Sequence, residues 1–171
     1  MYGVSSYLAE YLETVTNVPG TTISLMLFIF GGASIIGNIV AGKLLTRNPV
    51  KSVASFPFVL GGVYLLLFVL GHFTLPMALI ILLFGIAVAI GNNVSQYWIA
   101  SAAPEAPEFS NGLFLAAGNL GVTAGTSVGG LVIAGMGTQY VVVGGFLFLI
   151  SSLAFILART YKYSPASQFS E

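Results

Sequence analysis

Five runs of apolar residues follow one another along the chain, separated by short polar breaks. A bilayer core about 30 Å thick needs roughly 20 apolar residues of helix to cross it. The breaks contain proline, glycine and asparagine, which favour turns, so successive runs are predicted to be antiparallel neighbours. The fold class expected is all-α, a polytopic transmembrane helix bundle. Its five full spans are predicted at residues 21–44, 51–71, 75–99, 110–135 and 139–159.

The residues before and after these runs predict two further segments. Residues 1–9 are expected to be the end of a sixth, truncated span, because an apolar stretch runs directly into the polar sequence Glu10–Thr14. We expect residues 10–20 to lie outside the membrane. The transmembrane unit is then expected over residues 1–163, and residues 164–171 are expected to form a cytoplasmic tail.

Composition narrows the chemistry of this chain. It has five basic and five acidic residues among 171, and 57% of its residues are hydrophobic. The lipid bilayer is therefore the expected surrounding of most of the chain. A formal net charge of zero, with scattered basic residues, excludes a face for binding nucleic acid. The chain has no cysteine, and we expect no cofactor and no bound metal.

The basic residues predict how the chain is oriented. Lys43, Arg47 and Lys51 surround one break, and Arg159 and Lys162 follow the last span. These two groups are four crossings apart, so they fall on the same side of the membrane. Because basic residues are enriched in cytoplasmic loops, the sequence predicts a multi-pass protein with a cytoplasmic C-terminus.

Small residues recur every four positions in the fourth full span, at Gly121, Gly125 and Gly129. This spacing places them on one face of a helix, where the absence of side chains allows another helix to approach closely. We interpret them as helix-packing residues rather than binding residues.

Polar side chains recur at membrane depth in three of the predicted spans. Such groups must face protein or water, because an unmet hydrogen bond in hydrocarbon costs several kcal/mol. One hypothesis is that they line a cavity. The alternative is that they hydrogen-bond between helices, each contributing about 0.6 to 2 kcal/mol. The cavity candidates are Asn92, Asn93, Gln96 and Tyr97 in residues 75–99, Asn119 and Thr123 in residues 110–135, and Ser34 and Asn38 in residues 21–44.

Carboxylates are confined to the ends of the predicted spans and to the segments between and after them. Glu10 and Glu13 lie at the outer boundary, and Glu105 and Glu108 lie in an inner loop. An intramembrane proton relay of the usual acidic kind therefore has no carboxylate in this chain. No nucleophile with its base is recognisable, so we expect no catalytic residues and no enzyme.

Two stretches resemble a known family. The sequence from Gly37 to Arg47 is similar to the eighth helix and the following cytoplasmic loop of major facilitator superfamily transporters. The sequence from Ala103 to Glu108, followed by Asn111 and by residues 118–121, resembles the loop between the tenth and eleventh helices of bacterial drug, sugar and nucleoside efflux permeases. The resemblance implies a C-terminal six-helix half with its first helix truncated.

The resemblance also implies a function and partners. A second, N-terminal half would enclose a central cavity with this one, and Lys43 and Arg47 would belong to a cytoplasmic gating loop, in which Thr46 stands where the family often has an acidic residue. The implied activity is secondary transport, as proton-coupled efflux of a small organic solute by an antiporter in the cell inner membrane. The alternative is a non-transporting accessory or remnant membrane protein.

Overall fold

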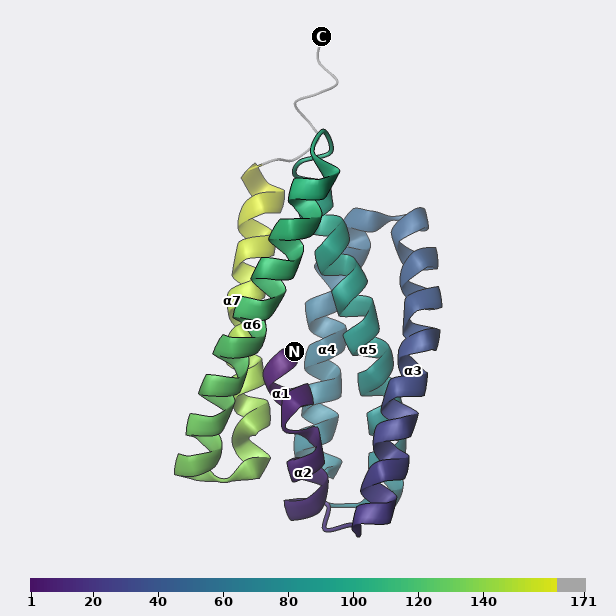
Figure 1. Cartoon of the computed structure of the whole chain (residues 1–171), viewed down its shortest axis with the longest axis vertical. Helices are drawn as coiled ribbons and strands as arrows, with labels where there is room; N and C mark the ends of the chain where they lie inside the picture. Colours follow the sequence, from purple (N-terminus) through teal and green to yellow (C-terminus); the bar gives the residue numbers. More distant parts are fainter. Residues whose placement is uncertain (163–171) are drawn as a thin grey trace.

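The computed structural model describes residues 1–162 of the chain, with side chains described for residues 1–158. Among these residues every regular element is a helix, and five helices are long and apolar enough to cross a membrane (Figure 1). The expected all-α transmembrane helix bundle is therefore confirmed. The elements are α1 (Tyr2–Ser6), α2 (Leu8–Thr14), α3 (Gly20–Arg47), α4 (Pro49–Leu70), α5 (Thr74–Ala100), α6 (Pro107–Met136), the 3-10 helix η1 (Thr138–Tyr140) and α7 (Val141–Lys162).

The long helices begin and end within a few residues of the predicted spans. Helices α4 and α6 begin earlier than predicted, at Pro49 and Pro107, because proline suits the first helical turn, where its missing N–H leaves no hydrogen bond unmade. The side chain of Asn48 caps α4 by accepting a hydrogen bond from the backbone N–H of Lys51 at 3.4 Å. The predicted tail at residues 164–171 lies outside the described residues.

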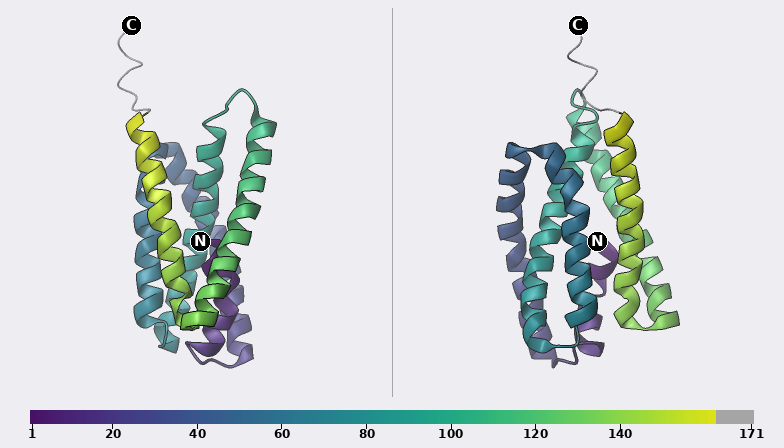
Figure 2. Two further views of the ribbon diagram at one scale, coloured as in Figure 1. Left: turned by 90° about the vertical axis from the view of Figure 1, so that its left-hand side faces the viewer. Right: turned by 180° about the vertical axis from the view of Figure 1, so that it is seen from behind.

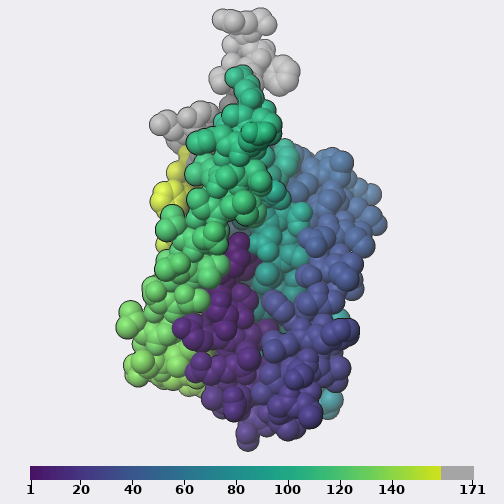
Figure 3. Space-filling model, in the orientation of Figure 1, coloured from purple at the N-terminus to yellow at the C-terminus, as the bar shows by residue number. Residues whose placement is uncertain are grey.

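The first segment differs from the prediction in length. Helical structure continues past residue 9, through α2 to Thr14, after a break at Tyr7 between α1 and α2. The polar stretch remains helical because it is amphipathic: Tyr11 and Leu12 are buried, whereas Glu13 is exposed. In Figure 3, α1 and α2 lie between α6 and α3 on the face toward the viewer, and α1 contacts α6 and α7 while α2 contacts α3.

The hydrophobic core gathers around this first segment. Two pairs of aromatic rings pack at its centre: Tyr64 with Phe84, with ring centroids 6.1 Å apart, and Tyr64 with Phe146, edge to face at 5.7 Å. Helices α1 and α2 contribute their buried side chains to the same cluster, so they join α4, α5 and α7 into one core. The fully buried large side chains include Leu8, Tyr11, Leu12, Tyr64, Leu67, Met77, Ile81, Phe84, Val141 and Val142.

Helices α3 and α5 pack closely through small residues. A Cβ atom on Gly37 of α3 would lie 2.6 Å from the carbonyl oxygen of Ile86 and 2.7 Å from the Cβ of Ala89. In the other direction, a Cβ atom on Gly85 of α5 would lie 2.9 Å from the Cβ of Ala33. Each glycine thus allows the opposite backbone to approach to contact distance. This packing fixes the rotation of α3 against α5.

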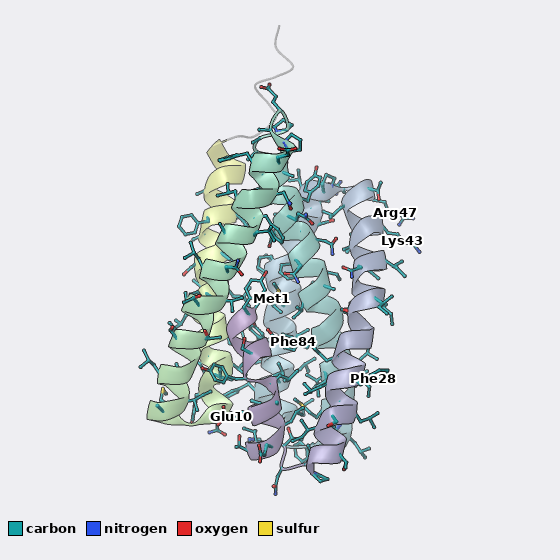
Figure 4. All side chains as sticks on the ribbon, viewed as in Figure 1. Met1, Glu10, Phe28, Lys43, Arg47 and Phe84 are labelled. Carbon is teal, nitrogen blue, oxygen red and sulfur yellow. The ribbon has the colours of Figure 1, made fainter. Side chains whose placement is uncertain are left out.

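The two ends of the bundle carry different connections. The α3–α4 and α5–α6 connections lie at the same end of the bundle as the C-terminal end of α7. The α2–α3, α4–α5 and α6–α7 connections lie at the opposite end (Figures 1 and 2). Lys43 and Arg47 point outward near the end of α3 (Figure 4). Both are exposed, and Arg47 is in the last helical turn, where the helix dipole favours a cation.

Two side chains tie the first segment to the end of α4. The hydroxyl of Tyr11 donates a hydrogen bond to the carbonyl oxygen of Leu67 at 2.7 Å, and the hydroxyl of Thr16 donates one to the carbonyl oxygen of Gly71 at 2.7 Å. Carbonyl groups in the last turn of a helix lack partners within that helix or share them. These hydroxyls therefore hold α2 and the residues after it against α4.

Replacing Tyr11 by phenylalanine is expected to lower the free energy of unfolding by about 1 kcal/mol, because it removes one buried hydrogen bond and leaves the ring in place. The measurement is denaturant unfolding in detergent micelles, followed by circular dichroism. Tyr97→Phe is the matched control, since Tyr97 is 38% exposed and its change should leave the midpoint unaltered. Equal midpoints for the two variants would contradict this role of Tyr11.

Candidate functional site

An open cavity of about 410 Å³ lies where α1, α3, α5 and α6 meet. Most of its polar wall comes from the part of α5 that is closer to Ala100, and α1 and α3 each add one side chain. No lining residue carries a formal charge. The lining residues are Tyr2, Asn38, Asn92, Asn93, Gln96 and Phe114.

Two hydrogen bonds connect α5 to the helices on either side of this cavity. The hydroxyl of Tyr2 donates to Oδ1 of Asn92 at 2.7 Å. Nδ2 of Asn93 donates to Oδ1 of Asn38 at 2.7 Å and to the carbonyl oxygen of Ala89 at 2.8 Å. Asn92 and Asn93 are consecutive, so they point about 100° apart around the helix. Asn92 therefore faces α1, and Asn93 faces α3.

Close backbone packing places the partners of both amides. Asn38 follows Gly37, whose contact with Ile86 and Ala89 brings α3 against α5. Tyr2 precedes Gly3, and a Cβ atom on Gly3 would lie 2.5 Å from the carbonyl oxygen of Gly125. Gly37 thus sets the distance between α3 and α5, and Gly3 sets the distance between α1 and α6. Each glycine is adjacent to one of the hydrogen-bonding side chains, Asn38 and Tyr2.

The candidates predicted from sequence separate into two groups. Asn38, Asn92, Asn93 and Gln96 lie together on the cavity wall. The other predicted candidates lie outside this lining. Ser34 donates to the carbonyl oxygen of Gly31 at 2.5 Å, Thr123 donates to that of Asn119 at 3.0 Å, and both Asn119 and Tyr97 are exposed.

Two lining residues, Tyr2 and Phe114, were not predicted from the sequence. Tyr2 stands in the segment taken as the end of a truncated span, and the signal available was a tyrosine within an otherwise apolar stretch. Phe114 is an apolar residue in an apolar span, so the pattern alone gave no indication of it. Together they add one hydroxyl and one aromatic face to a wall otherwise made of amides.

The three glycines predicted to pack lie against the first segment. The ring of Tyr2 would be 3.5 Å from a Cβ on Gly121, and the backbone nitrogen of Gly3 would be 2.9 Å from a Cβ on Gly125. A Cβ on Gly129 would lie 2.8 Å from the ring of Tyr7. The hydroxyl of Tyr7 also donates to the carbonyl oxygen of Thr126 at 2.9 Å. The glycine face of α6 therefore contacts α1 and Tyr7.

A second cavity, of about 330 Å³, lies between α1 and the helices α4 to α7. Its wall is mostly apolar and includes the glycine faces of α6 and α7, with Ser95 and Ser152 among its few polar side chains. Within the described part of the chain, no three His, Asp or Glu side chains gather in a way that could hold a metal ion. Because the wall of this second cavity is mostly apolar, the amide-lined cavity is the stronger candidate for a polar solute.

Comparison with known proteins gives a family for this arrangement. The family model described as Major Facilitator Superfamily matches residues 1–171. A Pseudomonas aeruginosa protein named transcription regulatory protein OpdE is 29% identical over 93% of this chain and 40% of its own length. Proteins named probable sugar efflux transporter are 29% identical in Helicobacter pylori, over 85% of this chain and 38% of theirs, and 25% identical in Pasteurella multocida, over 92% and 39%.

The chain thus spans about two fifths of the length of these relatives. The family match covers every helix described above, including the short first segment. The bundle of apolar helices, with uncharged polar groups facing a cavity, agrees with a protein of the membrane. The chain belongs to the Major Facilitator Superfamily.

Proposed function

We propose that this chain is the C-terminal half of a secondary transporter that exports a small, neutral organic solute, and that the amide-lined cavity binds this solute. The observation that carries the proposal is the set of four amide side chains on one cavity wall, joined by a tyrosine hydroxyl and an aromatic ring. Uncharged amides donate and accept hydrogen bonds, and the face of an aromatic side chain packs against the apolar side of a solute ring. This chemistry suits a polyhydroxylated solute, and two of the relatives named above are named for sugar efflux.

The size and position of the cavity support the same proposal. Small-molecule sites have volumes of about 300 to 1,000 Å³, and the amide-lined cavity has a volume of about 410 Å³. Its lining includes Asn38 of α3 and Phe114 of α6, and we propose that a second half-transporter closes it on this side. In transporters built from repeated halves, solute sites lie at the interface between the halves near the membrane midplane, and rocking of the halves exposes them alternately to each side.

Proton coupling is part of the proposal, and it requires a proton-exchanging group in the N-terminal half. The acidic side chains in the described part of this chain, Glu10, Glu13, Glu105 and Glu108, lie near the ends of helices or in the α5–α6 connection rather than on the cavity wall. A proton-exchanging carboxylate would then belong to the N-terminal half. We further propose that the membrane is the cell inner membrane and that the C-terminus is cytoplasmic, because Lys43, Arg47 and Lys51 cluster at the same end as the close of α7.

An efflux assay tests the solute site. The chain is fused behind the N-terminal half of the Helicobacter pylori relative, and cells loaded with radiolabelled methyl α-D-glucoside are followed as they lose it. Gln96→Leu is expected to slow efflux about tenfold, since the loss of hydrogen bonds to a solute costs about 1 to 3 kcal/mol. Phe155→Leu is the control, because Phe155 is 78% exposed on the outer face of α7 and is absent from the cavity lining.

Efflux from the fusion no faster than from cells carrying the N-terminal half alone would contradict the transport proposal. Equal efflux by Gln96→Leu and Phe155→Leu would keep transport but contradict the location of the site. A second candidate function is that of a non-transporting accessory membrane protein, which is favoured by the regulatory name of the Pseudomonas aeruginosa relative. It predicts that deletion of the chain changes transcript levels while solute efflux is unchanged.

A further inference from the structure

The side-chain amide of Asn93 has a fixed orientation, and this orientation determines which end of Asn38 faces the cavity. We infer that Asn38 is a specificity-determining residue whose NH2 group donates hydrogen bonds to an acceptor oxygen of the solute, and that Asn93 is the residue that positions it. The inference rests on the proposed solute site. It adds a chemical direction to that site, because it states which group of the solute is recognised.

The orientation follows from a chain of three groups. The carbonyl oxygen of Ala89 is only an acceptor, so the atom of Asn93 that lies 2.8 Å from it must be the NH2 nitrogen. The same nitrogen lies 2.7 Å from the side chain of Asn38. Two NH2 groups cannot hydrogen-bond through their hydrogens, so the atom of Asn38 at this contact must be its oxygen. A hydrogen-bond network of this kind distinguishes the two ends of an amide.

The consequence for Asn38 is that its oxygen is occupied and its NH2 group is not. Within the part of the chain that the structure describes, Nδ2 of Asn38 has no hydrogen-bond partner, and Asn38 lines the cavity. An NH2 group has two donor hydrogens and accepts no hydrogen bond. A solute at this wall therefore meets a donor, and its complementary group is a carbonyl, ether or hydroxyl oxygen.

The contact between Tyr2 and Asn92 does not fix an orientation by the same logic. A phenol hydroxyl donates or accepts, so either end of the Asn92 amide satisfies it. In the structure the hydroxyl donates to Oδ1 of Asn92, which leaves the NH2 group of Asn92 as a second donor on this wall. Only the Asn93–Asn38 pair is tied to a backbone carbonyl. It is therefore this pair that sets the direction of recognition.

Two variants separate the positioning role from the donor role. Asn38→Asp retains an oxygen for Asn93 to donate to, yet it replaces the free NH2 group by a second oxygen. It should preserve the contact between α3 and α5 and weaken binding of methyl α-D-glucoside about tenfold. Asn93→Leu leaves Asn38 intact but frees its amide to rotate, and it should weaken binding to a smaller extent. If Asn38 served only to join two helices, Asn38→Asp would bind the probe as the unchanged chain does.

Hydrogen exchange of the side-chain amides tests the orientation without any solute. The chain, labelled with 15N-asparagine, is placed in lipid nanodiscs and followed by NMR. The NH2 hydrogens of Asn93, both engaged, should exchange about tenfold more slowly than those of Asn38. Asn48 is the internal reference, because its oxygen caps α4 while its exposed NH2 group is free. Faster exchange at Asn93 than at Asn38 would overturn the orientation.

Adding methyl α-D-glucoside then tests recognition. The inference expects the Asn38 amide resonances to shift and their exchange to slow, with Asn93 unchanged. Shifts at Asn92 or Gln96 without a shift at Asn38 would overturn the donor role of Asn38 while leaving the solute site in place. A probe that shifts none of these amides would overturn the proposed site, and the donor role with it, while the exchange rates would still report the orientation of Asn93.

Discussion

Replacing Gly37 by valine is expected to lower the free energy of unfolding by about 1 to 3 kcal/mol, through overpacking between α3 and α5. The new Cβ atom would lie 2.6 Å from the carbonyl oxygen of Ile86 and 2.7 Å from the Cβ of Ala89, and neither backbone nor Cβ can move aside as a flexible side chain can. Helix α3 must therefore shift. Because Asn38 is the next residue, the hydrogen bond from Asn93 should be lost as well.

The measurement is unfolding of purified protein in micelles with increasing denaturant, followed by helical circular dichroism. Gly42→Val is the matched control on the same helix, since nothing lies within 4 Å of a Cβ at Gly42. Both variants make the same change in helix propensity, so any difference between them isolates the contact with α5. If the two midpoints coincide, helices α3 and α5 do not pack as described.

Replacing Gly125 by valine is expected to displace α1 from α6. A Cβ atom there would lie 2.9 Å from the backbone nitrogen of Gly3 and 3.2 Å from its Cα. Two backbones in contact have no side-chain freedom to relieve the overlap, so we expect a loss of about 1 to 3 kcal/mol in stability. The hydrogen bond from Tyr2 to Asn92 should be lost too, because Tyr2 is adjacent to Gly3.

Thermal unfolding in nanodiscs measures this second effect. Gly135→Val on the same helix is the control, because nothing lies within 4 Å of a Cβ at Gly135. We expect a clearly lower midpoint for Gly125→Val than for Gly135→Val. A Gly125→Val protein as stable as the control would mean that α1 is not held against the glycine face of α6.

The spans were predictable because length and hydropathy are local properties of the chain. Each break carries residues that favour turns, and the helices end within a few residues of them. The first segment was less predictable. Its helix continues to Thr14 because burial of Tyr11 and Leu12 on one face stabilises a stretch that appears polar when averaged.

The candidate site was predictable only in part, and amides were better indicators than hydroxyls. Ser34 and Thr123 donate to carbonyl oxygens of their own helices, so these hydroxyls need neither a cavity nor a neighbour. An amide has more donors and acceptors than its own helix satisfies, and Asn92 and Asn93 accordingly reach other helices. The pairing of Asn93 with Asn38 depends on the rotation of α3 against α5, which Gly37 sets through contact with Ile86 and Ala89, residues far from it in the sequence.

Water access to the amide wall separates a solute cavity from a surface that faces lipid. The chain has no cysteine, so single cysteines at Gln96 and at Phe155 can be compared in lipid vesicles with a charged methanethiosulfonate reagent, which reacts with thiolates in water. We expect Gln96→Cys to react about tenfold faster than Phe155→Cys, and methyl α-D-glucoside to slow only the Gln96→Cys reaction. Equal, slow modification at both positions would contradict a solute cavity at this wall.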